Sequence, residues 1–204
     1  MGYVSIIPEL DGMHVAATSY AVIGGLPQYT CDPNMPLDDA WTEHAWNTPT
    51  FFANTIGYTP INDLYTEPEY TIGNQKFIID LGDEYVIERI YYENGHSVGY
   101  VGTPEYGAKN TIIYGSNSPD VLLDIDYYSV FNLTQLWSGI LEKHAVVNAS
   151  DPKYIDLINS TPYRYYVFRI ADNWGSNQKM CIRRIELQYF DVDSSSSSSS
   201  SSSL

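Results

Sequence analysis

Positively charged residues are scarce in this chain of 204 residues. Ten lysines and arginines stand against 25 aspartates and glutamates, so the formal net charge is −15 at pH 7. Proteins that bind nucleic-acid backbones or anionic membranes need a basic face, and this imbalance therefore argues against both partners. It is compatible with a neutral ligand or with bound calcium.

Cysteine is almost absent, since only Cys31 and Cys181 occur, far apart in the sequence. A disulfide-stabilised scaffold would be richer in cysteine, so we expect two free thiols. No apolar run approaches the roughly 20 residues that a membrane-spanning helix needs. The first residues also lack the basic and long apolar regions of a secretory signal peptide. The sequence therefore predicts neither membrane insertion nor a recognisable leader.

Catalytic motifs are equally sparse. The four histidines lie in separate segments without the HExxH spacing of zinc enzymes. Neither a GxSxG motif nor a glycine-rich phosphate loop occurs. Acidic residues are numerous enough to supply the carboxylate pair of a glycosidase, which keeps an enzyme among the alternatives. The missing motifs favour a protein without catalytic activity.

The chain does contain a series of short segments rich in β-branched and aromatic residues. Gly, Asn, Asp and Ser separate them and favour turns. The predicted strands span residues 77–81, 85–92, 110–114, 133–137, 163–170 and 180–190. Alternation in the 163–170 segment places Tyr166, Phe168 and Ile170 on one face. We find no convincing long helix and predict an all-β fold, an antiparallel sandwich or jelly roll.

The two ends of the chain differ from this middle part. Residues 1–75 contain a candidate strand at 13–23 and then a long segment rich in Pro, Asn, Thr and aromatic residues. Segments of this length in compact domains are usually functional or packed, so we expect it to pack on the sandwich or extend it. The sandwich core should span 76–193. Ten serines before Leu204 predict a disordered tail or linker over residues 194–204.

Four pieces of sequence occur in a family-specific order. They are FIIDLG (77–82) followed by IERI (87–90), AKNTIIYGSN (108–117), YRYYVFRI (163–170) and RRIEL (183–187). Together they resemble the discoidin domain, also called the coagulation factor 5/8 type C domain, one of the galactose-binding-like jelly rolls. The residues of these four pieces are most similar to those of modules in phage fibre and bacterial surface proteins. The serine tract also resembles linkers of phage fibre proteins.

The resemblance implies a non-enzymatic module that binds carbohydrate and mediates adhesion. Its partners would be a cell-surface glycan and neighbouring subunits of a multimeric assembly, which would add avidity to weak single sites. Its location would be a phage virion or a bacterial cell surface. The alternative is a structural virion or filament subunit whose loops contact other proteins and bind no sugar.

The resemblance also implies a core tryptophan and a calcium site near the start of the domain. The family often places Asp and Trp seven residues apart there, as Asp39 and Trp46 are in this chain. Trp46 would fill the core. Many such domains hold calcium between an Asp in this loop and a Glu on the last strand, positions that Asp39 and Glu186 match. Ala40 replaces the family's glycine, however, and Glu186 could instead be solvated or paired with arginine.

Three loops offer the aromatic faces and polar groups that grip sugars. The loop at 94–107 offers His96, Tyr100, Glu105 and Tyr106, the loop at 172–178 offers Asn173 and Trp174, and the first long segment offers Trp41 and His44. We favour the first two loops because each follows a strand that the resemblance places. The alternative is that Trp174 caps the sandwich end and that Tyr100 and Tyr106 pack their own loop.

Three of the ten basic residues cluster near the C-terminus, at Lys179, Arg183 and Arg184. In an extended strand Arg183 shares a face with apolar residues, so we expect it inside. A buried guanidinium needs a carboxylate or several carbonyls, and Asp39 or another acid of the first long segment is a candidate partner. Arg184 is predicted to point outward, and Lys179 lies in the preceding loop. A bulge within residues 180–184 would exchange the two faces.

Overall fold

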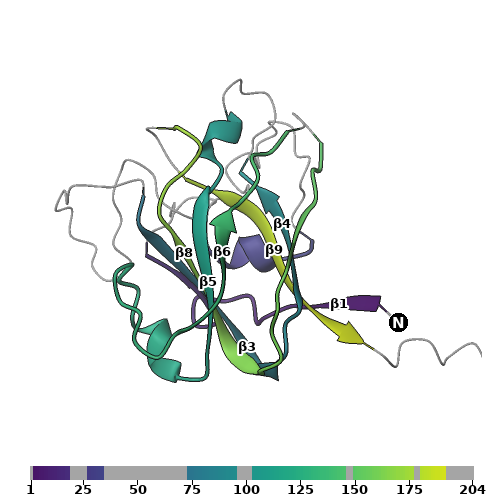
Figure 1. The fold of residues 1–204 in the computed structure, drawn as a ribbon, viewed down its shortest axis with the longest axis vertical. Coiled ribbons are helices and arrows are strands. Elements are labelled where there is room, and N and C mark those ends of the chain that lie inside the picture. Colours follow the sequence, from purple (N-terminus) through teal and green to yellow (C-terminus); the bar gives the residue numbers. More distant parts are fainter. Residues whose placement is uncertain are drawn as a thin grey trace, which may run out of the picture.

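The computed structural model describes residues 2–18, 27–34, 73–95, 103–145, 149–176 and 180–191, which form two antiparallel sheets (Figure 1). One sheet has the strand order β1-β9-β4-β7, and the other has the order β2-β3-β8-β5-β6. The predicted all-β sandwich is thereby confirmed. No helix in these ranges has the length and apolar character needed to cross a membrane.

The strands follow the predicted segments closely over the second half of the chain. Their bounds are β1 (Gly2–Ile6), β2 (Val15–Ala17), β3 (Gln75–Tyr85), β4 (Arg89–Asn94), β5 (Asn110–Ser116), β6 (Thr134–Ile140), β7 (Lys153–Asp156), β8 (Tyr163–Ile170) and β9 (Ile182–Asp191). The helical segments within the described residues are short 3-10 turns: η1 (Pro27–Cys31), η3 (Thr103–Tyr106) and η4 (Pro119–Leu122). The β8 bounds coincide with the prediction.

The core lies between the two sheets, where the alternating apolar residues of each strand meet. The predicted inward face of β8 is confirmed, because Tyr166, Phe168 and Ile170 all belong to the main buried cluster. The same cluster holds Ile90 of β4 and Leu187 of β9 from the opposite sheet. Burial of large apolar side chains on both inner faces supplies the main stabilisation of such a sandwich.

The outer face of the five-stranded sheet is also covered, by the connection from β5 to β6. A second buried cluster lies there, around Ile78, Tyr165 and Val167. Lys76 is buried beneath this connection, where its Nζ lies 3.3 Å from the Ser129 carbonyl and 3.4 Å from Asp124. Burial lowers the pKa of Lys76, and the nearby Asp124 carboxylate opposes that effect.

The N-terminal residues contribute a strand to each sheet. β1 pairs with β9, with Tyr3 opposite Phe190, and β2 pairs with β3, with Ala16 opposite Ile78. β2 lies inside the candidate strand at 13–23, whereas β1 and β7 had not been predicted. The partner of β1 lies at the far end of the sequence, so no local turn signal marks β1 as a strand.

The last strand contains the bulge that would exchange its faces. Glu93 of β4 is opposite Arg184, but the next residue, Asn94, is opposite Ile182, so one extra residue lies in β9. Ile182 therefore faces the core together with Ile185, although simple alternation along the strand would place these two residues on opposite faces. Arg184 is also buried, which contradicts its predicted exposure. The segment after η1 covers it, since Arg184 Nη2 lies 3.4 Å from the carbonyl oxygen of Pro33.

Candidate functional site

Several connections meet at one end of the sandwich, where the two favoured ligand loops were predicted. η3 lies at the top of Figure 1, at the opposite end from η4. The Trp174 N–H donates to the Gly107 carbonyl at 3.1 Å, and the Ser176 N–H donates to the Glu105 carbonyl at 3.3 Å. The described parts of the two loops thus form one surface, which we call the loop end. It comprises residues 103–109, 141–145 and 171–176.

Asn94 fastens this end to β4. Its Nδ2 donates to the carbonyls of Ala108 at 2.8 Å and Glu142 at 2.7 Å, and the residue is 1% exposed. Gly95 follows it in a crowded position, where a Cβ atom would lie 2.2 Å from Cys181 Sγ. The sequence Asn94-Gly95 reads as an ordinary turn, so sequence reasoning missed that Asn94 ties three chain segments together.

Trp174 is half-buried and is held from two sides. Its indole N–H donates to the Leu141 carbonyl at 3.1 Å, which fixes the ring against the residue that follows β6. The Lys109 ammonium lies 5.1 Å from the ring centroid, within cation–π range. Trp174 therefore helps to hold the loop end together, and what it can offer a ligand is ring surface beside a positive charge.

Asn173 shapes its own loop. Its Oδ1 accepts the Gly175 N–H at 2.9 Å, and its Nδ2 donates to the Ser176 carbonyl at 2.9 Å. The preceding Asp172 accepts the side-chain amide of Asn110 at 2.9 and 2.8 Å. These bonds hold the loop in a fixed shape. In the contacts described here, the Asn173 side chain binds the backbone of its own loop.

Tyr106 ends η3 and is half-buried, while the adjacent Glu105 is exposed. The Tyr106 carbonyl accepts the Cys181 N–H at 2.9 Å, which joins η3 to the start of β9. Tyr106 and Trp174, predicted from separate loops, thus lie on one connected framework.

A buried network of polar side chains lies next to the loop end. Glu93 is fully buried and accepts hydrogen bonds from the Tyr91 hydroxyl at 2.8 Å, the Asp151 N–H at 2.7 Å and the Ser150 hydroxyl. His144 lies beside it, with Nδ1 3.9 Å from Glu93 Oε2. Burial and the hydrogen bond to Glu93 raise the pKa of Tyr91 well above its usual value. The spacing of these residues in the sequence forms no recognisable motif, so the network was not predicted.

Glu186, the predicted calcium ligand of the last strand, has protein partners. Its carboxylate accepts the Ser5 hydroxyl at 2.6 Å and forms an ion pair with Arg184 at 3.3 Å. Pairing with arginine was the alternative to a calcium site, and it is what the described residues show. The calcium site stays a prediction, since Asp39 lies outside the described residues.

Arg183 is fully buried, as predicted from its strand position. Its proposed tie to Asp39 stays a prediction for the same reason. Several other predicted residues also fall outside the described ranges: Trp41, His44, Trp46, His96, Tyr100, Lys179 and the serine-rich tail.

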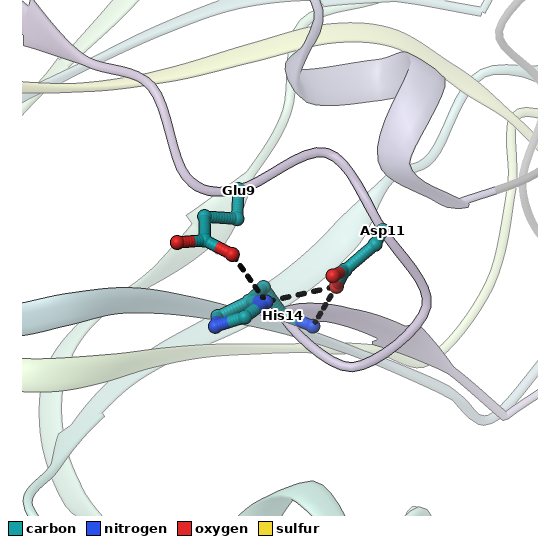
Figure 2. A group of neighbouring side chains, drawn as sticks. All are labelled: Glu9, Asp11 and His14. Atoms are coloured by element: carbon teal, nitrogen blue, oxygen red, sulfur yellow. Dashed lines mark hydrogen bonds and ion pairs between the residues drawn. The ribbon is translucent and has the colours of Figure 1, made fainter.

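A small acidic cluster lies between β1 and β2 (Figure 2). Asp11 Oδ1 accepts the His14 ring N–H at 2.8 Å and the backbone N–H groups of Met13 and His14 at 2.9 Å, and Glu9 lies 3.7 Å from the same ring nitrogen. The hydrogen bond from His14 lowers the pKa of Asp11. Within the described residues this is the one group of three side chains with metal-ligand spacing. Its bonds form a turn that leads into β2.

The two antiparallel sheets form a jelly-roll β-sandwich. No protein-family model and no curated protein matches the chain in sequence. Solved structures of the same fold match over 92% of the chain. The resemblance inferred from the four sequence pieces is thereby confirmed for the fold.

Three solved structures illustrate the match. A chitosan-binding module of a chitosanase/glucanase from Paenibacillus sp. IK-5 is 12% identical, is 99% covered and gives a TM-score of 0.54. The family 32 carbohydrate-binding module of NanJ from Clostridium perfringens, in complex with galactose, is 12% identical, is 99% covered and gives 0.53. An F-lectin (fucolectin) from striped bass serum is 15% identical, is 49% covered and gives 0.52.

Proposed function

We propose that this chain is a non-enzymatic carbohydrate-binding module that holds a glycan at its loop end. The proposal rests on the 3.1 Å hydrogen bond from the Trp174 backbone N–H to the Gly107 carbonyl, which joins the two loops predicted to bind a ligand. Similar folds support it, since their names describe a chitosan-binding module, a module complexed with galactose and a fucolectin.

The chemistry of the loop end suits a sugar. The Trp174 ring can pack against the apolar face of a pyranose, while exposed Glu105 and Glu142 can accept hydrogen bonds from hydroxyls. Lys109 beside the ring supplies a donor. Opposite charges close together favour a polar, uncharged ligand over a polyanion, in agreement with the net charge of −15.

The rigid framework should improve binding. The loops are held in place by side-chain hydrogen bonds from Asn94, Asn173 and Trp174. Little of the loop structure therefore has to become ordered when a ligand binds. Loops that are already ordered lower the entropic cost of association.

The proposed setting is a phage virion or a bacterial surface assembly, where the chain would mediate adhesion through several copies. The proposed setting rests on the residues of the four sequence pieces and on the serine tract. A calcium ion held by Asp39 and Glu186 belongs to the same proposal. A thermal-melting experiment tests it, because calcium at about 1 mM should raise Tm and EDTA should reverse the rise.

A glycan array with the intact chain tests sugar binding. We expect Trp174→Ala and Tyr106→Ala to weaken the signals, whereas Tyr128→Ala should leave them unchanged because this exposed tyrosine lies on the β5–β6 connection. Near-ultraviolet circular dichroism checks that the variants fold. Absence of any glycan signal from the intact, multimerised chain would contradict the proposal and favour the structural-subunit alternative.

A further inference from the structure

The outer face of the four-stranded sheet carries a second group of aromatic side chains. Strand register places them on one face, because directly paired residues of antiparallel strands point to the same side. Tyr3 is opposite Phe190, Tyr91 is opposite Tyr154, and Arg89 is opposite both Gln188 and Asp156. These residues alternate with core residues such as Leu187 and Ile155. They therefore point away from the core, and we call them the tyrosine platform.

The aromatic rings of the platform are accessible and in mutual contact. Tyr154 is 54% exposed, Phe190 is 40% exposed and Tyr3 is 37% exposed. The Tyr3 and Phe190 centroids lie 5.5 Å apart, and those of Tyr91 and Tyr154 lie 5.6 Å apart, both in edge-to-face geometry. Such pairs restrain each other's rotation and provide a fixed apolar surface.

Arg89 links the two aromatic pairs across the sheet. Its guanidinium lies 3.9 Å from the Tyr3 centroid and 5.2 Å from the Tyr154 centroid. Its Nε donates to Asp156 at 2.9 Å, which fixes the plane of the group. Aromatic rings and hydrogen-bonding groups therefore lie side by side across the four strands. The width of the four strands is roughly 14 Å at the usual strand spacing.

Charged groups at the centre of the platform are paired. Its cation, Arg89, forms an ion pair with Asp156 at 2.9 Å, so a polyanion would find no excess of base among the platform residues. Glu88 lies at the edge of the platform, where its carboxylate accepts the Phe190 backbone N–H at 3.0 Å. The face is complementary to an uncharged ligand with both apolar and hydroxyl surfaces.

The platform is distinct from the loop end. Phe190 lies near the end of β9, whereas Ile182 at the strand's start adjoins the loop end through Cys181. Eight residues of extended strand separate these points by about 26 Å. Tyr154 lies nearer to the loop end, because its partner Tyr91 is three residues before Asn94 on β4, but both point to the outer face of the sheet.

We propose that the tyrosine platform is a second binding surface, specific for an extended, uncharged polysaccharide. Tyr154 supplies the most exposed ring, and Tyr3 with Phe190 supplies a second apolar contact for the chain. Arg89, Gln188 and Asp156 hydrogen-bond to hydroxyls between them. This inference goes beyond the proposed loop-end function and does not depend on it.

Affinity electrophoresis in gels containing soluble galactomannan, xyloglucan or mixed-linkage β-glucan tests the platform. The intact chain should be retarded by at least one of these neutral polymers and not by polygalacturonate. Tyr154→Ala should weaken the retardation about tenfold in Kd, equivalent to about 1.4 kcal/mol. Tyr154→Phe should preserve it because the ring remains, and Tyr128→Ala serves as the exposed-tyrosine control.

The double variant Trp174→Ala/Tyr106→Ala separates the two sites. If the platform binds, this variant keeps its retardation and loses it only when Tyr154→Ala is added. Absence of retardation by every neutral polymer, or equal retardation of Tyr154→Ala and the intact chain, would overturn the inference. So would a dimer in analytical ultracentrifugation that Tyr154→Ala converts to monomer, since the face would then bind a second copy.

Discussion

Asp80 and Arg164 join β3 to β8 through two parallel hydrogen bonds. Arg164 Nε lies 2.7 Å from Asp80 Oδ1, and Nη2 lies 2.9 Å from Oδ2. The geometry is the bidentate one in which arginine binds carboxylates most strongly. The same Asp80 accepts the Gly82 N–H at 2.8 Å, so one carboxylate fixes both the neighbouring strand and the irregular part of β3 that follows Asp80.

This pair predicts an acid-dependent loss of stability. Burial alone would raise the pKa of Asp80, but the hydrogen bonds from Arg164 and Gly82 outweigh burial and hold it below its usual 3.8. A depressed pKa stabilises the fold above the unfolded value, and this stabilisation is lost as pH falls through the folded value. Asp80→Asn should therefore lower Tm at pH 7, and the difference from the intact chain should shrink below about pH 4.

Thermal melts at pH 7, 5, 4 and 3 measure that difference. Asp120→Asn is the control, because this exposed carboxylate has no arginine partner among the described ion pairs. A Tm difference for Asp80→Asn that stays constant from pH 7 to pH 3 would argue against the linkage.

Tyr166 predicts a second stability effect, inside the core. Its hydroxyl donates to the Tyr85 carbonyl at 2.8 Å and accepts the Ile87 N–H at 3.2 Å. Tyr166→Phe keeps the ring but leaves both backbone groups unpaired, so the free energy of unfolding should fall by about 1–2 kcal/mol. Urea denaturation measures the fall, with the exposed Tyr128→Phe as control. Equal stability of the two variants would show that water replaces the lost hydroxyl.

Local patterns in the sequence were sufficient to predict the bounds of β8 but not the faces of β9. The 163–170 segment alternates cleanly and follows a proline, and β8 has those bounds. The faces of β9 could not be predicted, because the bulge depends on the pairing of Glu93 and Asn94 with Arg184 and Ile182. Face assignment by residue parity fails wherever one strand of a pair inserts an extra residue.

The loop end was only partly predictable for a similar reason. Aromatic and amide residues after strands pointed to Trp174 and Tyr106, and backbone hydrogen bonds bring their loops together. Asn94 and Lys109 could not be singled out, since their contacts join segments far apart in sequence. Their importance depends on tertiary contacts, which a local pattern does not encode.

Arg183 allows a direct test of the predicted tie to the first long segment. The side chain is fully buried, so Arg183→Met should destabilise the fold by about 3–5 kcal/mol, as removal of one member of a buried charge pair does. If Asp39 is the partner, a double-mutant cycle with Asp39→Asn should give a coupling energy above about 1 kcal/mol. A cycle with Asp38→Asn is the matched control. Additive effects of Arg183→Met and Asp39→Asn would exclude Asp39 as the partner.

The two cysteines should resist modification in the folded protein. Cys31 and Cys181 are both buried, and burial raises the pKa of the Cys31 thiol far above its usual value of 9.0. The thiolate is the reactive form, so a thiol reagent such as DTNB should not react at pH 8. Both thiols should react after addition of guanidinium chloride. Rapid reaction of the native protein would mean that the segments covering them open readily.

Asn94 should control the order of the loop end more than that of the rest of the fold. Asn94→Ala removes the shared donor of the Ala108 and Glu142 carbonyls, which should lower the free energy of unfolding by about 2–4 kcal/mol. Hydrogen exchange should accelerate first in residues 103–109 and 141–145, since these segments lose their anchor to β4. Asn117→Ala is the matched control, because Asn117 also forms two bonds, to Pro162 and Arg164, at the opposite end. If both variants accelerate the same segments, Asn94 is a general stabilising residue, and its specific role at the loop end is wrong.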